Sequence, residues 1–397
     1  MIPSPTASAT AERTLPGRTL LLLGALTAVA PLVTDLYLPA LPQLGDAWGA
    51  DDATTQLTMS VCLIGLALGQ LVAGPLSDRV GRLRPLRWGI GVLAVTSFLC
   101  ALAPDVGTLI VLRAIQGLAG SAGVVIARAI VRDVYEGERA ARVFSELMLV
   151  TGLAPVLGPV LGGQLLRVTD WRGIFVVLAL LSTLLLVAVL TRLPETRTGV
   201  AQVGGSDLRL LLRDRRFTRY LGMSAAFGVV LFAYISMSSF VLQDGYGVSA
   251  SAYSLVFGAN AVGMILGSQV SARLVGRTGA ASMLIAAVGL IVCSTAAVAA
   301  AGVLGAPLAV VLVPLWLVLV GLGAALGNTV ALALLPHRER AGAASALIGT
   351  AQFLFGAAIP PLASLGGASA GRMGVTMLAA SVVALGCQVA ACAGRRD

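Results

Sequence analysis

Long apolar runs separated by short polar segments dominate the chain. Each run holds roughly 20 residues, enough for a helix to cross the ~30 Å hydrocarbon core of a bilayer. The pattern predicts twelve transmembrane helices, at 19–42, 54–76, 87–104, 106–131, 141–165, 172–192, 217–242, 251–273, 280–302, 307–335, 341–366 and 373–392. The expected fold class is therefore an all-α integral membrane protein.

The composition agrees with that class. Of the 397 residues, 57% are hydrophobic and 11% are charged, and the mean hydropathy is +0.93. A soluble protein carries about a quarter charged residues. Residues 1–17 are polar, and we interpret them as a disordered tail. A signal peptide is the alternative, but the following apolar run is longer than a signal core and lacks a clear small-residue cleavage site.

The positive charge carries topology information. The net charge is +9, and all 27 basic residues are arginine. With the N-terminus placed inside the cell, 23 arginines fall in cytoplasmic segments, three in outer loops, and Arg113 within a span. Because arginine in short loops favours the cytoplasmic side, we expect both termini in the cytoplasm of a bacterium, with the chain in the inner membrane. The distribution indicates contact with lipid headgroups and argues against a nucleic-acid partner.

The cysteines do not predict a disulfide framework or a metal site. They lie in apolar segments, with neither CxxC spacing nor a nearby histidine. They are Cys62, Cys100, Cys293, Cys387 and Cys392. We therefore expect no cofactor.

The longest polar interruption, 193–216, divides the chain into halves at 18–192 and 217–397. The halves repeat, since "GLAGSAGVVIARA" at 117–129 aligns with "GLGAALGNTVALA" at 321–333, 204 positions later. A parallel duplication of six helices predicts a central cavity between two six-helix halves.

Of the acidic residues, only Asp35 and Glu146 fall inside the predicted spans, and Arg113 is the only arginine well inside one. A charge at the bilayer centre is costly, so each should face the bundle interior and have a partner. Asp35 and Arg113 are expected at the same depth, as either a structural ion pair or a proton site. In the second case, burial favours the neutral carboxyl and the arginine favours the charged one. Glu146 is expected either in a second proton-coupling layer or as a helix-end charge that meets Arg142 or Arg139.

Two further segments carry patterned chemistry. The loop "GPLSDRVGRLRPL" (74–86) combines glycines, which permit tight backbone geometry, with alternating charges, and its expected counterpart is Asp133. The loop residues of interest are Gly74, Asp78, Arg79, Gly81 and Arg82. A solvated loop is the alternative.

The fifth span holds "GLAPVLGPVLGG" (152–163). Its prolines remove backbone donors and its glycines thin the helix, so it can bend and approach a neighbour closely. The residues of interest are Pro155, Gly158, Pro159, Gly162 and Gly163. A generic kinked span is the alternative.

These motifs together resemble the major facilitator superfamily, and within it the 12-span drug:proton antiporters of the bicyclomycin/chloramphenicol-resistance (Bcr/CflA) family. "TDLYLPALP" is similar to the family's first-span motif, "LRAIQGLAGSAG" to its fourth-span motif and "APVLGPVLGG" to the fifth-span motif associated with antiport. The 74–86 loop resembles the superfamily loop motif, except that Leu83 occupies a usually basic position. The second half matches weakly, with Leu317 where a repeat of Arg113 would fall.

The resemblance implies proton-coupled export of phenicol- or bicyclomycin-like drugs by alternating access. Protons would be the coupling ion, with Asp35, Arg113 and Glu146 as coupling residues. Asp78, Arg79, Arg82 and Asp133 would latch the inner gate while the cavity faces outward. We expect a monomer in the lipid bilayer that takes a small-molecule substrate.

Pocket residues are predicted from polar or aromatic positions in mid-span. They are Tyr37, Gln116, Tyr234, Asn260, Asn328 and Gln352. For each, an interhelical hydrogen bond is the alternative. His337, the single histidine, is expected to be a loop residue.

Other functions remain to be weighed. Proton-coupled transport of a native metabolite is the nearest alternative. An intramembrane enzyme would need a nucleophile–base set or a metal cluster, which one loop histidine and two scattered carboxylates do not supply, so we expect no enzymatic activity. A passive channel is disfavoured by the two-fold repeat and the buried charges.

Overall fold

The computed structural model describes residues 16–135, 143, 147, 150, 157–196, 208–337 and 341–393. The first half contains α1 (Gly17–Asp35), a 3-10 turn η1 (Leu38–Ala40), α2 (Leu41–Trp48), α3 (Asp52–Val80), α4 (Leu83–Ala101), α5 (Val106–Val134), a helical segment at 157–165 and α7 (Trp171–Arg192). The second half contains α8 (Leu208–Arg213), α9 (Arg215–Phe240), a π turn η2 (Val241–Gly245), α10 (Ala250–Thr278), α11 (Ala280–Val303), α12 (Leu308–Leu334), α13 (Ala341–Ala363) and α14 (Ala370–Ala393).

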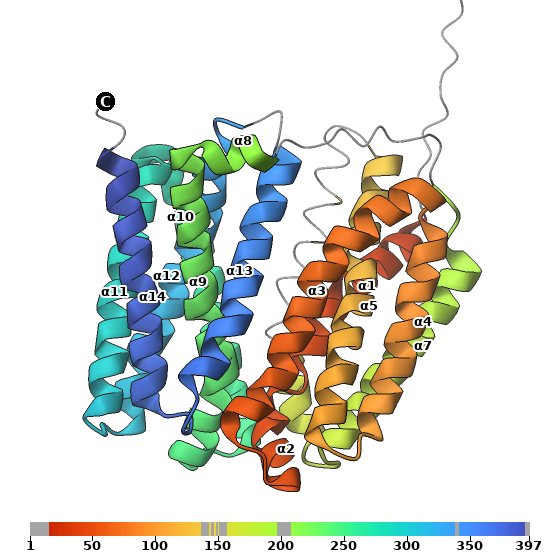
Figure 1. The fold of residues 1–397 in the computed structure, drawn as a ribbon, viewed down its shortest axis with the longest axis horizontal. Coiled ribbons are helices and arrows are strands. Elements are labelled where there is room, and N and C mark those ends of the chain that lie inside the picture. Colours follow the sequence, from red (N-terminus) through yellow and green to blue (C-terminus); the bar gives the residue numbers. More distant parts are fainter. Residues whose placement is uncertain are drawn as a thin grey trace, which may run out of the picture.

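The helices form two bundles that lie side by side (Figure 1). In one, α3 packs on α5, α4 packs on α5 and α7, and α1 packs on α5. In the other, α9 packs on α13 and α14, α11 on α12 and α14, and α10 on α12. One end of the molecule carries α8 and the opposite end carries α2, and we call these ends the α8 face and the α2 face.

Ten helical stretches in the described part of the chain are long and apolar enough to cross a membrane. The helix α4 runs alongside them (Figure 1). The observed bounds follow the predicted spans closely, and most of the fifth span, including Glu146 and Pro155, lies outside the described residues. The chain is therefore an all-α, multi-pass membrane protein.

The first span differs from its prediction. Its long helix ends at Asp35, and the chain continues through η1 and α2 to Trp48. Pro39 lies in η1, and because proline has no N–H it cannot continue the i→i−4 ladder. Asp35 therefore stands at a helix end instead of in mid-helix.

Polar caps begin several helices after the short loops. Side-chain oxygens of Asp51, Asp105 and Asp170 accept hydrogen bonds from backbone N–H groups of the first turns of α3, α5 and α7, and Ser249 does so for α10. Such caps satisfy donors that have no partner within the helix. The sequence therefore fixes where these helices start.

Glycines set the closest helix packing in both bundles. A Cβ at Gly117 of α5 would clash with the Cys62 carbonyl of α3, and one at Gly323 of α12 would clash with the Met264 carbonyl of α10. Small residues allow this backbone approach in membrane helices. Corresponding helix pairs thus use the same device in the two halves.

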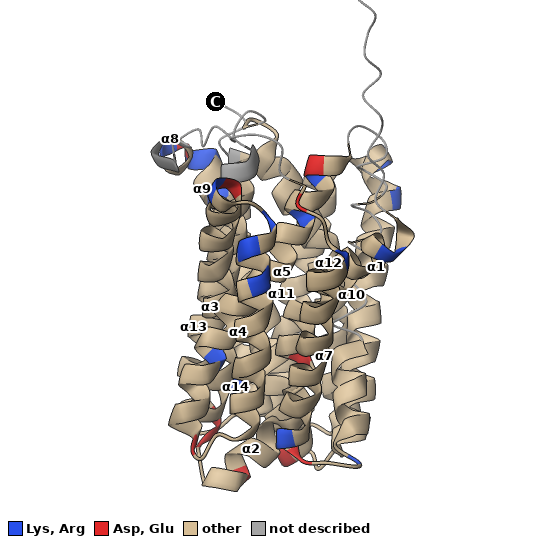
Figure 2. Ribbon diagram, turned by 90° about the vertical axis from the view of Figure 1, so that its right-hand side faces the viewer, with Lys and Arg blue, Asp and Glu red and all other residues tan. Residues whose placement is uncertain are grey.

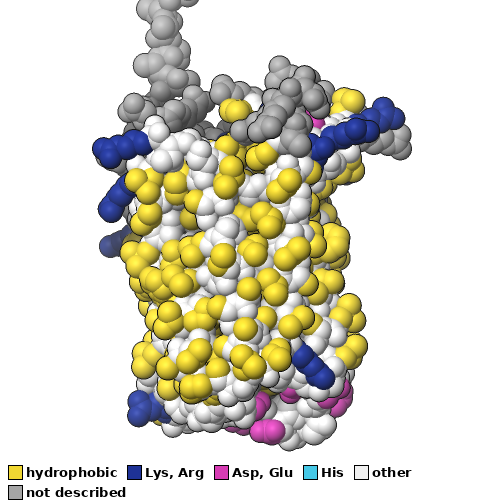
Figure 3. All heavy atoms as spheres, turned by 90° about the vertical axis from the view of Figure 1, so that its left-hand side faces the viewer, with side chains coloured by type: hydrophobic (Ala, Val, Ile, Leu, Met, Phe, Trp, Pro, Cys, Tyr) yellow, Lys and Arg dark blue, Asp and Glu magenta, His cyan; other side chains and the backbone are white. Residues whose placement is uncertain are grey.

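The surface matches a protein embedded in lipid. Apolar side chains cover the middle of the face in Figure 3, and charged side chains gather toward its two ends. Figure 2 shows most charged residues toward the two ends of the ribbon, with a few between them. Exposed leucines and valines such as Leu184 and Val383 face outward from α7 and α14, as lipid contact requires.

Candidate functional site

A cavity of about 310 Å³ lies between the two bundles. The first half lines it with one face of α1, with α3 and with α5; the second half lines it with α9, α10, α12 and α13. The lining residues are Thr27, Ala30, Pro31, Thr34, Asp35, Leu63, Leu66, Gln70, Val124, Arg128, Leu231, Phe232, Tyr234, Ile235, Phe257, Ala261, Met264, Leu319 and Phe353. Larger hollows lie on the outside of single bundles, so this is the cavity that both halves share.

Asp35 is the acidic residue of this lining. Its side chain is 6% exposed, and its Oδ1 accepts a hydrogen bond of 2.8 Å from the Thr34 hydroxyl. A carboxyl group held in an apolar cavity can exchange a proton when its surroundings change, because burial penalises its charged form. Its position agrees with the sequence prediction of an interior-facing carboxyl.

The helical segment 157–165 packs directly on the Asp35 region. A Cβ at Gly158 would lie 3.1 Å from the Asp35 Cβ, and one at Gly162 would clash with the Leu36 carbonyl. A Cβ at Gly163 would clash with Ser254 of α10, in the other bundle. Pro159 lies between these glycines. The glycines of the fifth-span motif therefore hold three elements together around Asp35.

Arg113 is fully buried beside the cavity. It donates to the carbonyls of Val33 (3.0 Å) and Thr58 (3.3 Å) and to the Gln116 amide oxygen (2.6 Å), and its guanidinium carbon lies 4.2 Å from the Tyr37 ring centre. Gln116 in turn donates to Ser97, at 2.7 Å. The arginine thus ties α5 to α1 and α3.

The direct Asp35–Arg113 ion pair considered from the sequence is not formed. Among the described residues, the salt bridges involve other groups, and Arg113 reaches α1 at the Val33 carbonyl. Arg113 instead donates to the carbonyls of Val33 and Thr58 and to Gln116, while Asp35 accepts from Thr34. The two charges share a depth without touching.

The predicted pocket residues separate into two groups. Tyr234 lines the cavity, and its hydroxyl accepts a hydrogen bond of 3.0 Å from Asn260. The other five lie outside the lining. Tyr37 and Gln116 belong to the Arg113 network, Asn328 donates to Ser271 of α10, and Gln352 lies on α13 where it packs on α9. These residues contact neighbouring helices, which was the alternative to a place in the pocket.

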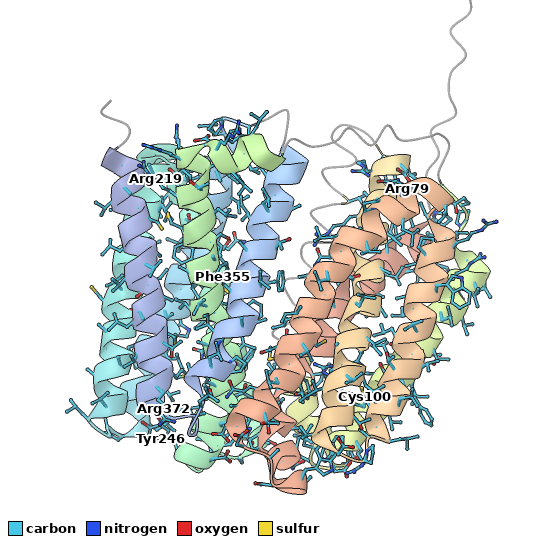
Figure 4. All side chains as sticks on the ribbon, viewed as in Figure 1. Arg79, Cys100, Arg219, Tyr246, Phe355 and Arg372 are labelled. Atoms are coloured by element: carbon cyan, nitrogen blue, oxygen red, sulfur yellow. The ribbon has the colours of Figure 1, made fainter. Side chains whose placement is uncertain are left out.

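The charged loop residues form a network at the α8 face. Arg82 donates from Nε to Asp133 (2.7 Å) and from Nη1 to Ser77 (2.8 Å), and it forms a salt bridge with Asp78. Burial opposes the charged form of Arg82, but Asp133 and Asp78 outweigh it and raise its pKa. Arg79 lies exposed at this face (Figure 4).

Glu195, after α7, completes this network, and the sequence did not single it out. Its carboxylate accepts from the backbone N–H groups of Arg82 (2.9 Å) and Leu83 (3.0 Å). Gly81, at φ +94°, brings the chain close to this carboxylate. Gly74 lies inside α3, and a Cβ there would make an ordinary contact with Val125. The hydrogen bonds of this network join segments of the first half.

Contacts between the bundles close the α2 face. Gln56 donates to Ser364 (2.8 Å), the Ala368 N–H to Asp52 (2.6 Å), and Ser239 to the Leu38 carbonyl (2.8 Å). The Gln243 amide donates to the Pro39 carbonyl at 3.1 Å. These contacts seal one end of the cavity with hydrogen bonds that the sequence pattern did not predict.

His337 lies in the loop after α12, as the sequence predicted, and packs against the start of α9. Its Nε2 is 2.8 Å from Asp214 Oδ2, and Phe217 packs edge-on against its ring. Burial alone would raise the pKa of Asp214, but hydrogen bonds from Arg216 N–H and His337 lower it. In the described chain, His, Cys, Asp and Glu side chains form no group of three that could hold a metal ion.

Known proteins resemble this chain over most of its length. The family model described as Major Facilitator Superfamily matches residues 23–361. The chain is 36% identical to the MFS-type transporter YdgK of Bacillus subtilis over 373 residues, covering 91% of this chain and 92% of that protein. It is 30% identical to the bicyclomycin resistance protein homolog of Haemophilus influenzae, covering 92% and 94%.

A chloramphenicol resistance protein of Pseudomonas aeruginosa is 32% identical over 77% of this chain and 74% of its own. Among solved structures, a bacterial homolog of the human lysosomal transporter Spinster, inward-facing and occupied, aligns with a TM-score of 0.76 at 17% identity, covering 96% and 97%. The chain is a transporter and not an enzyme, and it belongs to the major facilitator superfamily.

Proposed function

We propose that this protein exports drug-like small molecules in exchange for protons. The observation that carries the proposal is Asp35, a buried carboxyl in the wall of the cavity between the bundles. Support comes from relatives named for bicyclomycin and chloramphenicol resistance. Phenicol- or bicyclomycin-like molecules are the proposed substrates.

The α8 face is proposed to be cytoplasmic, in a bacterial inner membrane, with halves at 18–192 and 217–397 joined by the linker 193–216. The arginine bias of the sequence supports this orientation. The substrate enters from the α8 side while the α2 face is closed by the bonds from Gln56 and Ser239. We propose that a monomer is sufficient, with protons as the coupling ion and no other cofactor.

The Asp35 carboxylate is proposed to hold the proton. Thr34 donates to the charged form, and the apolar wall favours the neutral one. Substrate binds while Asp35 is charged, the bundles rock, and a proton from the other side neutralises Asp35 and helps release the substrate. Arg113 holds the α1 backbone beside Asp35 through Val33, and Glu146 is retained as a second candidate for coupling.

The driving force is adequate for this cycle. A potential of roughly 120 mV is worth about 2.8 kcal/mol per charge, and half a pH unit adds about 0.7 kcal/mol. Together they support a gradient of about a few hundredfold for a neutral substrate.

The network of Asp78, Arg82 and Asp133 is proposed to brace the α8 end as the halves rock, with Arg79, Gly74 and Gly81 as parts of the same loop. The brace keeps α3, α4 and α5 together through bonds within the first half. The glycines and Pro159 of 157–165 are proposed as the hinge, because their packing joins Asp35 to α10.

Inside-out vesicles with an acidified lumen test the proposal. Lumenal pH is followed as chloramphenicol and related drugs are added, for wild type, Asp35→Asn and the exposed control Asp46→Asn. We expect drug-triggered proton release in wild type and the control, and none in Asp35→Asn. Release in all three would move coupling away from Asp35, with Glu146→Gln tested next. No release in any folded variant would refute drug:proton exchange.

A further inference from the structure

A second charged residue lines the cavity. In the described lining, Asp35 and Arg128 are the charged side chains, and they lie on α1 and α5 of the same half. Arg128 falls in a segment that the arginine distribution assigns to the cytoplasmic edge. The cavity wall instead includes it.

Arg128 is partly buried and has fewer hydrogen-bond partners than Arg82 or Arg113. Its Nε is buried and has no hydrogen-bond partner, and no carboxylate of the described chain forms a salt bridge with it. Arg82 and Arg113 each bind several acceptors, although Nη2 of Arg113 has none. The buried Nε atoms of Arg87 and Arg216 also lack partners, but Arg128 is the one of these residues that lines the cavity. Arginine stays charged under all physiological conditions, and a buried N–H donor without an acceptor is costly. An acceptor from outside the chain would remove that cost.

The two charges stand at different levels of the cavity. A Cβ at Gly123 of α5 would lie 2.7 Å from the Leu26 carbonyl of α1, which places these two residues at one level. Asp35 lies nine residues from Leu26 toward the α2 face, and Arg128 lies five residues from Gly123 toward the α8 face. Their backbones are therefore separated by roughly 20 Å along the helices, at ~1.5 Å per residue.

The opposite wall is aromatic. Phe232 lies 5.5 Å from Phe353, and Tyr234 stacks on Phe257 at 5.2 Å between ring centres. A molecule in the cavity thus meets a polar stripe of Arg128, Gln70 and Asp35 on one side and aromatic rings on the other. This arrangement suits an aromatic body that carries one acidic group.

We propose that Arg128 is an anion-binding residue and that the preferred substrates are aromatic organic acids or zwitterions whose acidic group binds its guanidinium. The guanidinium fork matches a carboxylate in two parallel hydrogen bonds. Because Arg128 lies nearer the α8 face, it receives the acidic group as the molecule enters, and Asp35 remains available for the proton. The identity of these molecules as cargo rests on the proposed function, whereas their binding does not.

Matched acid and neutral pairs test the proposal. Binding of benzoate against benzamide, and of chloramphenicol hemisuccinate against chloramphenicol, is measured by calorimetry on the purified full chain at pH 7. The variants are Arg128→Gln, Arg128→Lys and Arg132→Gln, an exposed arginine one turn further along α5. We expect wild type to bind the acid of each pair about tenfold or more tightly than the neutral partner.

Arg132→Gln should keep this acid preference, Arg128→Gln should lose it, and Arg128→Lys should keep part of it, because lysine retains the charge without the fork. Equal affinity for acid and neutral partner in wild type overturns the proposal, whatever the variants do. An acid preference that survives in folded Arg128→Gln also overturns it.

The vesicle experiment separates this proposal from the proposed function. Asp35→Asn should abolish drug-triggered proton release and keep the acid preference. An acid preference without proton release in wild type would leave the Arg128 site standing and refute proton-coupled export. Proton release without an acid preference would support proton-coupled export and overturn the Arg128 site.

Discussion

The two halves share their helix packing but differ in what they bury. The first half places Asp35, Arg113 and Arg128 in or beside the cavity, whereas the second half lines it with aromatic and aliphatic side chains. At the repeat position of Arg113 stands Leu317. The duplicated fold therefore depends on apolar packing and glycine contacts that both copies retain. The charged chemistry is free to reside in one copy, while the other supplies an adaptable wall.

Replacing Arg113 by the residue of the second half gives the largest expected effect. Arg113→Leu removes the donor to the Gln116 amide oxygen and the side-chain donor shared by the carbonyls of Val33 and Thr58. Losing buried hydrogen bonds to a charged group costs on the order of 3 kcal/mol. The midpoint temperature of thermal unfolding in detergent should therefore fall strongly, and transport should be lost.

The matched change in the second half, Leu317→Met, conserves volume and should cost less than about 1.5 kcal/mol. If the two variants lost stability equally, the halves would not differ as described.

The network at the α8 face comes next. Arg82→Gln removes the cation shared by Asp78 and Asp133, and we expect a loss of about 2 kcal/mol with reduced transport. Arg84→Gln, an exposed neighbour on α4, should change unfolding by less than ~0.5 kcal/mol. The two variants are compared by denaturant unfolding and by drug uptake in vesicles. If Arg82→Gln and Arg84→Gln had equal effects on both, the network would not contribute to stability or transport.

One pair of glycines at equivalent repeat positions sharpens the comparison. A Cβ at Gly123 would lie 2.7 Å from the Leu26 carbonyl, whereas one at Gly327 would meet nothing within 4 Å. Gly123→Ala should therefore destabilise the protein by about 1–3 kcal/mol through overpacking. Gly327→Ala should be neutral or stabilise its helix by up to about 1 kcal/mol. The midpoint temperatures of thermal unfolding are compared for the two variants. A greater loss of stability in Gly327→Ala than in Gly123→Ala would contradict this packing.

The smallest effect concerns Asp214 and His337. His337 stands 204 positions after Asp133, and like Asp133 it contacts a side chain at the start of another helix, here the Asp214 carboxylate before α9. Hydrogen bonds to its charged form hold the pKa of Asp214 below its ordinary value of 3.8. Its stabilising contribution is present above pH 3.8 and is lost as the pH falls through the lowered pKa.

Asp214→Ala should cost about 1 kcal/mol at pH 7 through the lost cap. Unfolding midpoints measured from pH 7 to pH 3 should show this difference shrinking in acid. A difference that stays constant over that range would assign it to something other than the carboxylate.

The sequence predicted the helices well because apolar run length is a strong, local signal. Asp35 was predicted to face the interior because an unpaired charge cannot face lipid, and the contact of Arg82 with Asp133 followed from complementary charges at neighbouring helix ends. Arg128 and Glu195 were missed, since a charge near a predicted span end is indistinguishable from a loop charge until the neighbouring helices are placed.

The pocket was the weakest part of the prediction. Polar mid-span residues were chosen for chemistry, yet which helix face meets the cavity depends on rotation about the axis. Asn260 and Asn328 turn toward neighbouring helices. The aromatic residues Phe232 and Phe353 carried no signal of their own in a chain that is 57% hydrophobic.

The closed α2 face has a consequence for the environments in which the protein can work. Three of the bonds that seal it, from Gln56, Ser239 and Gln243, are between uncharged groups, so dissolved ions do not screen them as they screen surface ion pairs. The fourth, from the Ala368 N–H, ends on the Asp52 carboxylate. Water can replace each bond almost in kind when the seal parts. The closing equilibrium should therefore depend only weakly on the salinity of the medium that bathes the α2 face.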